Sequence, residues 1–69
     1  MARLRVQEVA KEKGVSMGKL SRASDVSYRT IRLIYKDPYR DVALSTLEKL
    51  AKALGVSIAE LIEEEKDDN

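Results

Sequence analysis

The sequence of 69 residues predicts a single all-α domain built from five short helices. Apolar residues recur about every three or four positions, the spacing that gathers them on one face of a helix. Serines stand where these helices are expected to begin, and glycines and an Asp-Pro pair stand where they are expected to end. No segment alternates like a strand, and there is no long linker or internal repeat, so a second domain is not expected.

The first helix is expected over residues 4 to 13. Val6, Val9 and Ala10 share one face of this segment, as a helix packed on a core requires. Gly14 follows it in the position where glycine commonly ends a helix.

The second helix is expected over residues 17 to 24, with Ser16 as its N-cap. Leu20 and Ala23 are expected on its inner face. Asp25 occupies the turn that follows, and aspartate is among the few non-glycine residues that tolerate a left-handed backbone.

The third helix is expected to begin after its N-cap Ser27 and to run to Lys36, with Val26 filling the corner before it. The Asp37-Pro38 pair ends it, because proline disfavours a helical conformation in the residue before it. Two short helices around a tight turn, the second with polar and cationic side chains outward, form the architecture that places a helix in the major groove of DNA.

The fourth helix is expected over residues 45 to 54, ended by Gly55, and a fifth helix is expected after Ser57. Both begin with a serine that is followed three residues later by a glutamate, the spacing of a capping box. These pairs are Ser45 with Glu48 and Ser57 with Glu60.

Charge is distributed unevenly along the chain. Residues 1 to 40 carry a formal charge of +6 and residues 41 to 69 carry −5, although the whole chain carries only +1. Such asymmetry predicts a surface that faces a polyanion. The alternative is a chance segregation of solvated charges.

The composition disfavours several other classes of protein. The chain has no cysteine and no histidine, so disulfides are excluded and only carboxylates remain as metal ligands. An enzyme is not expected, because the usual bases and nucleophiles are absent and the carboxylates cluster near the C-terminus. We expect no cofactor, no metal and no small-molecule ligand. No apolar run approaches the roughly 18 residues of a membrane span and no hydrophobic signal segment is visible, which predicts a cytoplasmic protein without a membrane partner.

Two stretches together resemble the lambda-repressor/Cro-type helix-turn-helix regulators, also called the XRE family. They are MGKLSRASDVSYRTIRLIYK at 17 to 36 and LSTLEKLAKALGVSIAEL at 44 to 61. The resemblance covers residues 4 to 62 and implies a five-helix lambda-repressor-like domain with the helix-turn-helix at helices two and three. The predicted domain spans residues 1 to 62 and is followed by a frayed acidic tail over residues 63 to 69.

The function that the resemblance implies is sequence-specific binding of a double-stranded DNA operator by a transcriptional regulator, in particular a repressor. The third helix would then read the major groove. The alternative is a protein-interaction module, such as an antitoxin-like partner or an adaptor.

The resemblance also implies which residues contact DNA. On the recognition helix they are Ser27, Tyr28, Arg29 and Arg32, since arginine can bind a guanine edge through two hydrogen bonds. Phosphate contacts are expected from Ser16, Lys19, Lys36, Tyr39 and Arg40, and Met17, at the first position of the second helix, is placed with them at the DNA surface.

Alternatives stay open for several of these residues. Arg29 and Arg32 are otherwise solvated charges, although no acid lies between residues 28 and 36 to pair with them along the helix. Tyr39 either contacts DNA or packs over its own loop. Arg3 and Arg5 form either a basic arm or a solvated terminus.

Three positions depart from the family pattern. Met17 stands where many members have a glutamine that braces the recognition helix, and it cannot donate those hydrogen bonds. Asp25 replaces the usual turn glycine, and Tyr35 replaces an acid near the end of the third helix.

A symmetric homodimer is expected, because one such domain reads only about half of an operator. The fifth helix is the predicted interface, since its aliphatic residues exceed what a small core needs. These residues are Val56, Ile58, Leu61 and Ile62. The alternative is that all four belong to the core. A weak dimer in solution, stabilised on DNA, is expected.

Overall fold

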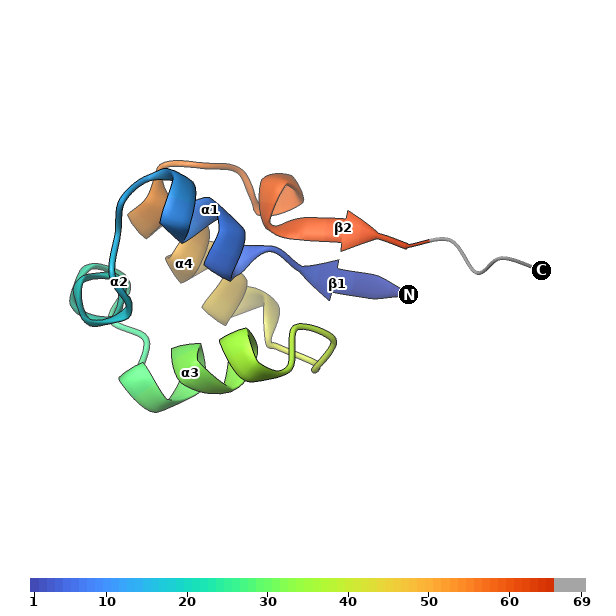
Figure 1. Ribbon diagram of the computed structural model, residues 1–69, viewed down its shortest axis with the longest axis horizontal. Coiled ribbons are helices and arrows are strands. Elements are labelled where there is room, and N and C mark those ends of the chain that lie inside the picture. Colours follow the sequence, from blue (N-terminus) through green and yellow to red (C-terminus); the bar gives the residue numbers. More distant parts are fainter. Residues whose placement is uncertain (66–69) are drawn as a thin grey trace.

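The computed structural model describes residues 1 to 65, which form four α-helices, one 3₁₀ helix and two short strands. Their order is β1 (Ala2–Leu4), α1 (Val6–Glu12), α2 (Met17–Ser24), α3 (Tyr28–Lys36), α4 (Leu44–Leu54), the 3₁₀ helix η1 (Ile58–Leu61) and β2 (Ile62–Glu64). Figure 1 shows α3 along one side of the molecule, with α1 and α4 above it and the two strands side by side at the end where the N-terminus lies.

The four α-helices and η1 pack around one apolar core. Its buried residues are Leu4, Val6, Val9, Ala10, Leu20, Val26, Ile31, Ile34, Leu47, Leu50, Ala51, Leu54 and Leu61. Most of the residues predicted to face inward do so, because the 3.6-residue period places them on one side of each helix. Ala23 was expected on the inner face of the second helix and is exposed instead, while Ser24 is buried.

The predicted caps of the helix-turn-helix are confirmed. The Ser16 hydroxyl oxygen accepts a hydrogen bond from the Lys19 backbone N–H at 3.2 Å. The Ser27 hydroxyl oxygen accepts one from the Thr30 N–H at 3.1 Å. Asp25 adopts the left-handed conformation with φ of 60°, so the turn between α2 and α3 has the predicted geometry.

The first helix is shorter than predicted. It begins at Val6, whereas residues 2 to 4 form β1, which pairs antiparallel with β2. The register joins Ala2 to Glu64, Arg3 to Glu63 and Leu4 to Ile62. The N-terminal segment is therefore extended, because its backbone hydrogen bonds go to a distant strand rather than to its own next turn.

The predicted fifth helix is not confirmed, and the described residues are not purely α-helical. Ser57 is followed by the single turn of η1, after which the chain extends into β2. The predicted Ser57–Glu60 pairing is present, since the Ser57 backbone N–H donates to Glu60 Oε1 at 3.3 Å. Residues 63 and 64 were expected in a frayed tail and instead belong to β2, while residues 66 to 69 of that predicted tail lie outside the described residues.

The start of the fourth helix also differs from the prediction. α4 begins at Leu44, and its N-cap Ala43 provides no side-chain hydrogen bond. Ser45 therefore lies inside the first turn and does not cap the helix, so the predicted Ser45–Glu48 capping box is wrong. Among the residues the structure describes, no helix is long and apolar enough to cross a membrane.

Candidate nucleic-acid interface

The helix-turn-helix is formed by α2, α3 and the residues that join them. Two side-chain hydrogen bonds hold this turn: the Ser21 hydroxyl donates to the Val26 carbonyl at 2.7 Å, and the Val26 N–H donates to the Ser24 hydroxyl at 3.2 Å. Val26 itself is buried in the core. The relative placement of α2 and α3 is thus set by both hydrogen bonds and apolar packing.

α3 has one buried face and one exposed face. Ile31 and Ile34 are buried in the core, which leaves Arg29, Arg32 and Lys36 exposed on the other side of the helix. Tyr28, the first residue of the helix, is 48% exposed. Within residues 1 to 65, none of the cations of α3 takes part in an ion pair.

The residues predicted to contact DNA from α2 have different surroundings. Lys19 is exposed, whereas Met17 is half-buried and packs against the core. Arg22 is also exposed and was not among the predicted contacts. It lies three residues after Lys19, so helical spacing would have placed the two on one side of α2. The guanidinium of Arg22 lies close to Gly18: its Nη1 is 3.7 Å from the position that a Cβ would occupy there.

The loop after α3 is folded onto itself and contacts Glu65, the residue that follows β2. The Tyr39 N–H donates to Asp37 Oδ1 at 3.3 Å, and the Arg40 N–H donates to the Asp37 carbonyl at 3.2 Å. The Tyr39 hydroxyl donates to Glu65 Oε1 at 2.7 Å. This hydrogen bond, together with burial, raises the pKa of Tyr39 above its ordinary value. Lys36, Tyr39 and Arg40 are all exposed.

Residues 5–67 match the family model described as the Cro/C1-type HTH DNA-binding domain. The chain belongs to this family. No curated protein matches the chain. The match covers both helices of the helix-turn-helix, and the family is one of DNA-binding domains.

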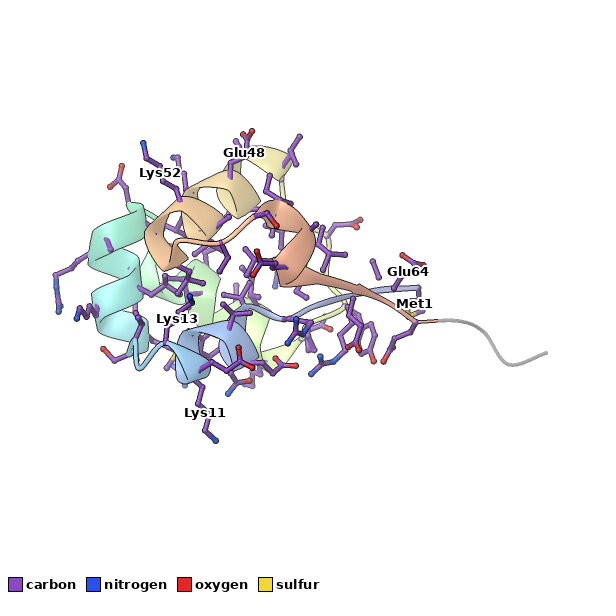
Figure 2. All side chains as sticks on the ribbon, turned by 90° about the horizontal axis from the view of Figure 1, so that it is seen from above. Met1, Lys11, Lys13, Glu48, Lys52 and Glu64 are labelled. Carbon is purple, nitrogen blue, oxygen red and sulfur yellow. The ribbon has the colours of Figure 1, made fainter. Side chains whose placement is uncertain are left out.

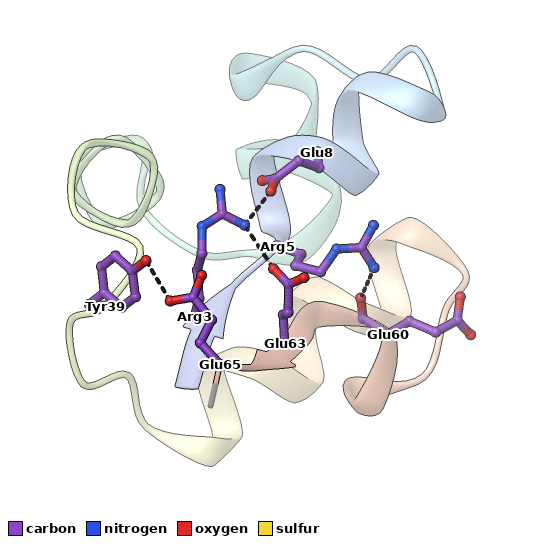
Figure 3. A network of polar contacts seen from close by, with 7 residues as sticks. All are labelled: Arg3, Arg5, Glu8, Tyr39, Glu60, Glu63 and Glu65. Atoms are coloured by element: carbon purple, nitrogen blue, oxygen red, sulfur yellow. Dashed lines mark hydrogen bonds and ion pairs between the residues drawn. The ribbon is translucent and has the colours of Figure 1, made fainter. Parts of the chain in front are cut away.

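The N-terminal arginines of this Cro/C1-type domain have partners in the fold. Arg3 Nη1 donates to Glu8 Oε2 of α1 and to Glu63 Oε1 of β2, the second at 3.4 Å. Arg5 Nη1 donates to the Glu60 carbonyl at 3.2 Å (Figure 3). Neither of the predicted alternatives, a basic arm or a solvated terminus, describes these residues, because Arg3 ties β1 to α1 and β2, and Arg5, the N-cap residue of α1, is bonded to η1.

The residues predicted to form a dimer interface divide into two groups. Leu61 is completely buried, so its assignment to a surface patch is wrong. Val56, Ile58 and Ile62 are half-buried and pack against the core. Ile62 also lines a surface pocket of about 170 Å³, together with residues of the loop before α4.

Tyr35 and Asp25, two departures from the family pattern, now have structural explanations. Tyr35 is half-buried against the core, and burial raises the pKa of its hydroxyl. An acid at position 35 would place a charged carboxylate against the apolar core, which is unfavourable. Asp25 provides the left-handed turn that glycine supplies elsewhere.

Proposed function

We propose that this Cro/C1-type domain is a sequence-specific double-stranded DNA-binding transcriptional repressor that reads the major groove with α3. The observation that carries this proposal is the exposed face of α3. It presents two arginines and a lysine, contains no acid, and within residues 1 to 65 has none of these cations in an ion pair. Unpaired cations on one helix face are the electrostatic footprint of a nucleic-acid-binding surface.

The size of α3 suits the groove that it would occupy. An α-helix with its side chains is about 10–12 Å across, which fits the width of about 12 Å of the major groove, and the nine residues of α3 would extend about 13.5 Å along it. Arg29 and Arg32 lie in the N-terminal two turns, from which a recognition helix commonly reaches base edges. Tyr28 would contact a phosphate or a thymine methyl group.

Residues on either side of α3 would position the domain on the phosphates. Lys19 and Arg22 on α2 would face one strand, and Lys36 and Arg40 would face the other. The hydroxyls of Ser16 and Ser27 accept the capping hydrogen bonds, so their contribution would be to hold the two helix N-termini in place for phosphate contact. Met17, which is half-buried, would add only an apolar contact.

We also propose that two copies bind one operator as a weak symmetric dimer. The support is exposed apolar surface outside the helix-turn-helix: Val56, Ile58 and Ile62 are half-buried, and Leu44, the first residue of α4, is 63% exposed. An isologous interface needs one such patch on each copy. Sedimentation with and without operator tests this. Leu44→Glu is the disrupting variant, and Gln7→Glu, at an exposed position of α1, is its charge-matched control. A wild-type protein that binds one copy per operator at all concentrations contradicts the dimer.

A salt titration tests DNA binding itself. If roughly five to seven phosphates are neutralised per copy, the logarithm of affinity falls with the logarithm of salt concentration by about 0.9 per phosphate. The measurement uses a labelled random duplex and the wild-type domain. Binding that is absent, or that does not respond to salt, rejects the proposal in favour of a protein-interaction module.

Substitutions then separate base-reading residues from phosphate contacts. Arg29→Ala and Arg32→Ala are expected to cost about 1–3 kcal/mol and to relax preference at one base pair each. Lys36→Ala is expected to weaken binding to all sequences alike and to reduce the salt slope by about one. Lys52→Ala is the control, because Lys52 is an exposed lysine on α4, outside the helix-turn-helix (Figure 2). Unchanged operator preference in both arginine variants rejects α3 as the reader.

A further inference from the structure

The loop that follows α3 is attached to the two-stranded sheet at two points. The Leu4 backbone N–H of β1 donates to the Pro38 carbonyl at 2.7 Å. The Tyr39 hydroxyl donates to Glu65 Oε1, also at 2.7 Å. Figure 3 shows the Tyr39 ring and the Glu65 carboxylate pointing toward one another from elements far apart in the sequence. The loop that carries Arg40 is therefore held by residues from both ends of the described chain.

The sheet determines where the Glu65 carboxylate lies. The Glu65 backbone N–H donates to the Met1 carbonyl at 2.9 Å, which extends the antiparallel pairing one step beyond β2. Successive side chains of a strand point to opposite faces. Glu64 accordingly has a different partner, the Met1 amino group at 3.1 Å. Glu65 alone of these two glutamates contacts the loop after α3.

We propose that Glu65 is a positioning residue for DNA binding, which acts through the Tyr39 hydroxyl to hold the loop after α3 in the conformation that presents Arg40 to the phosphates. This inference rests on the proposed function. Tyr39 is then a support of the interface and not a phosphate ligand, since its hydroxyl proton is already donated to Glu65. Arg40 follows Tyr39 directly, and its backbone N–H completes the same turn by donating to the Asp37 carbonyl.

Because Glu65 is negatively charged, the direction in which its substitution changes DNA affinity distinguishes a positioning role from an electrostatic one. A carboxylate near a DNA-binding surface repels phosphates, so a role through charge alone predicts tighter binding when Glu65 is neutralised in any way. A positioning role predicts the opposite for a variant that removes the acceptor atom. Glutamine separates the two, because it loses the charge but keeps a carbonyl oxygen that can accept from Tyr39.

The test compares Glu65→Ala, Glu65→Gln and Tyr39→Phe with wild type in duplex binding at one fixed salt concentration. Glu65→Ala and Tyr39→Phe are each expected to weaken binding by about three- to tenfold, the range of one hydrogen bond. Their double variant is expected to bind no more weakly than Tyr39→Phe alone, because both substitutions remove the same contact. Glu65→Gln is expected to retain wild-type affinity or exceed it.

Two further measurements complete the test. Glu64→Ala is the matched control, and it is expected to leave affinity unchanged or raise it, since Glu64 does not contact the loop. NMR titration of the Tyr39 ring is expected to show that its pKa falls toward the ordinary value in Glu65→Ala, which reports the contact directly.

Tighter binding by Glu65→Ala, or additive losses in the double variant, overturns the positioning role while leaving the proposed function in place. A wild-type protein that binds no duplex overturns both. The two failures are therefore distinguishable.

Discussion

Asp25 is the residue at which the helix-turn-helix depends on one unusual backbone conformation. It is the one non-glycine residue with positive φ among residues 1 to 65, and its N–H donates to the Ser21 carbonyl at the end of α2. L-residues pay a steric cost in this conformation that glycine avoids, and aspartate tolerates it better than most. The turn therefore forms with aspartate at this position, and the backbone of Asp25 retains part of that steric strain.

Asp25→Gly is expected to stabilise the domain by up to about 1 kcal/mol, because it removes the steric cost at a position that commonly holds glycine. Asp25→Val is expected to destabilise it by about 1–2 kcal/mol, since a β-branched side chain suits this conformation least. Urea denaturation of the three proteins measures both effects. A Gly variant less stable than wild type would show that the Asp25 side chain stabilises the turn.

Glu8 makes the stability of the domain depend on acid pH. Burial by itself would raise the pKa of Glu8, but the hydrogen bond and the positive charge of Arg3 outweigh burial and hold the pKa below its ordinary value of 4.5. Because the folded-state pKa is the lower one, the carboxylate contributes stability above pH 4.5. This contribution is lost as the pH falls through the folded-state value.

Glu8→Gln is therefore expected to lower the urea midpoint at neutral pH and to lose this effect in acid. The expected difference is small, because the ion pair with Arg3 is partly exposed and is screened by salt. Urea titrations of the two proteins at about pH 7 and about pH 2.5 check it. A difference that persists unchanged at the lower pH would assign the effect to packing and not to charge.

At the scale of elements, the starts of α3 and α4 differ in how they are capped. The Ser27 hydroxyl exchanges two hydrogen bonds with Thr30, one from the backbone N–H and one to the side chain at 2.8 Å. Ser45 stands one residue inside α4, where the cap is Ala43. The two serines look alike in the sequence, and only one of them satisfies a helix N-terminus.

Ser27→Ala is expected to cost about 1 kcal/mol of stability, the usual value of a lost N-cap. Ser45→Ala is expected to change stability by less than about 0.5 kcal/mol, as surface substitutions outside special positions do. Thermal or urea unfolding of both variants gives the comparison. Equal losses in the two variants would contradict the helix start at Leu44.

The two strands are elements that local reasoning could not identify. Each has three residues, which is too short for the alternation that distinguishes a strand from one turn of a helix. Ile58, Leu61 and Ile62 have helical spacing, yet Leu61 ends η1 and Ile62 begins β2. Two such strands are not stable alone, and these persist because they pack on the helices.

At the scale of the whole molecule, the stability of the domain depends on a small apolar core. A domain of this size folds with a small margin, so a single large cavity removes much of its stability. Leu50 is completely buried, whereas Leu44 on the same helix is 63% exposed. The two leucines provide a matched pair for measuring what burial contributes.

Leu50→Ala is expected to cost about 2–5 kcal/mol, enough to unfold much of the population. Leu44→Ala is expected to change the stability of the isolated domain by less than about 0.5 kcal/mol. Circular dichroism during urea titration measures both, at a concentration low enough to keep the protein monomeric. A large loss from Leu44→Ala at that concentration would mean that Leu44 is covered in the folded monomer.

The fold determines which charges of the basic N-terminal part of the chain are paired and which are not. Part of the basic excess of residues 1 to 40 is offset within the fold, because Arg3 contacts Glu63, which belongs to the acidic part of the chain. The cations of α3 have no such partners within residues 1 to 65. The fold therefore leaves the cations of α3 outside the ion pairs of residues 1 to 65, while it pairs Arg3 with carboxylates near the sheet.

The features that the sequence determined by itself are those whose physical cause lies within a few residues. The caps at Ser16 and Ser27, the left-handed Asp25 and the helix stop before Pro38 each depend on neighbours at most four positions away. The buried stripe of α3 follows from the helical period. These features were sufficient to predict a helix-turn-helix and the exposed cations of its second helix.

Only the tertiary structure decided the features that join distant parts of the chain. Arg3 meets Glu63 across 60 positions, and Tyr39 meets Glu65 across 26. Nothing in either local segment specifies such a partner, because a strand edge or a hydroxyl can be satisfied by many groups. The choice is made when burial of Leu4 and Leu61 brings the two ends of the domain together, and their backbones then pair with each other.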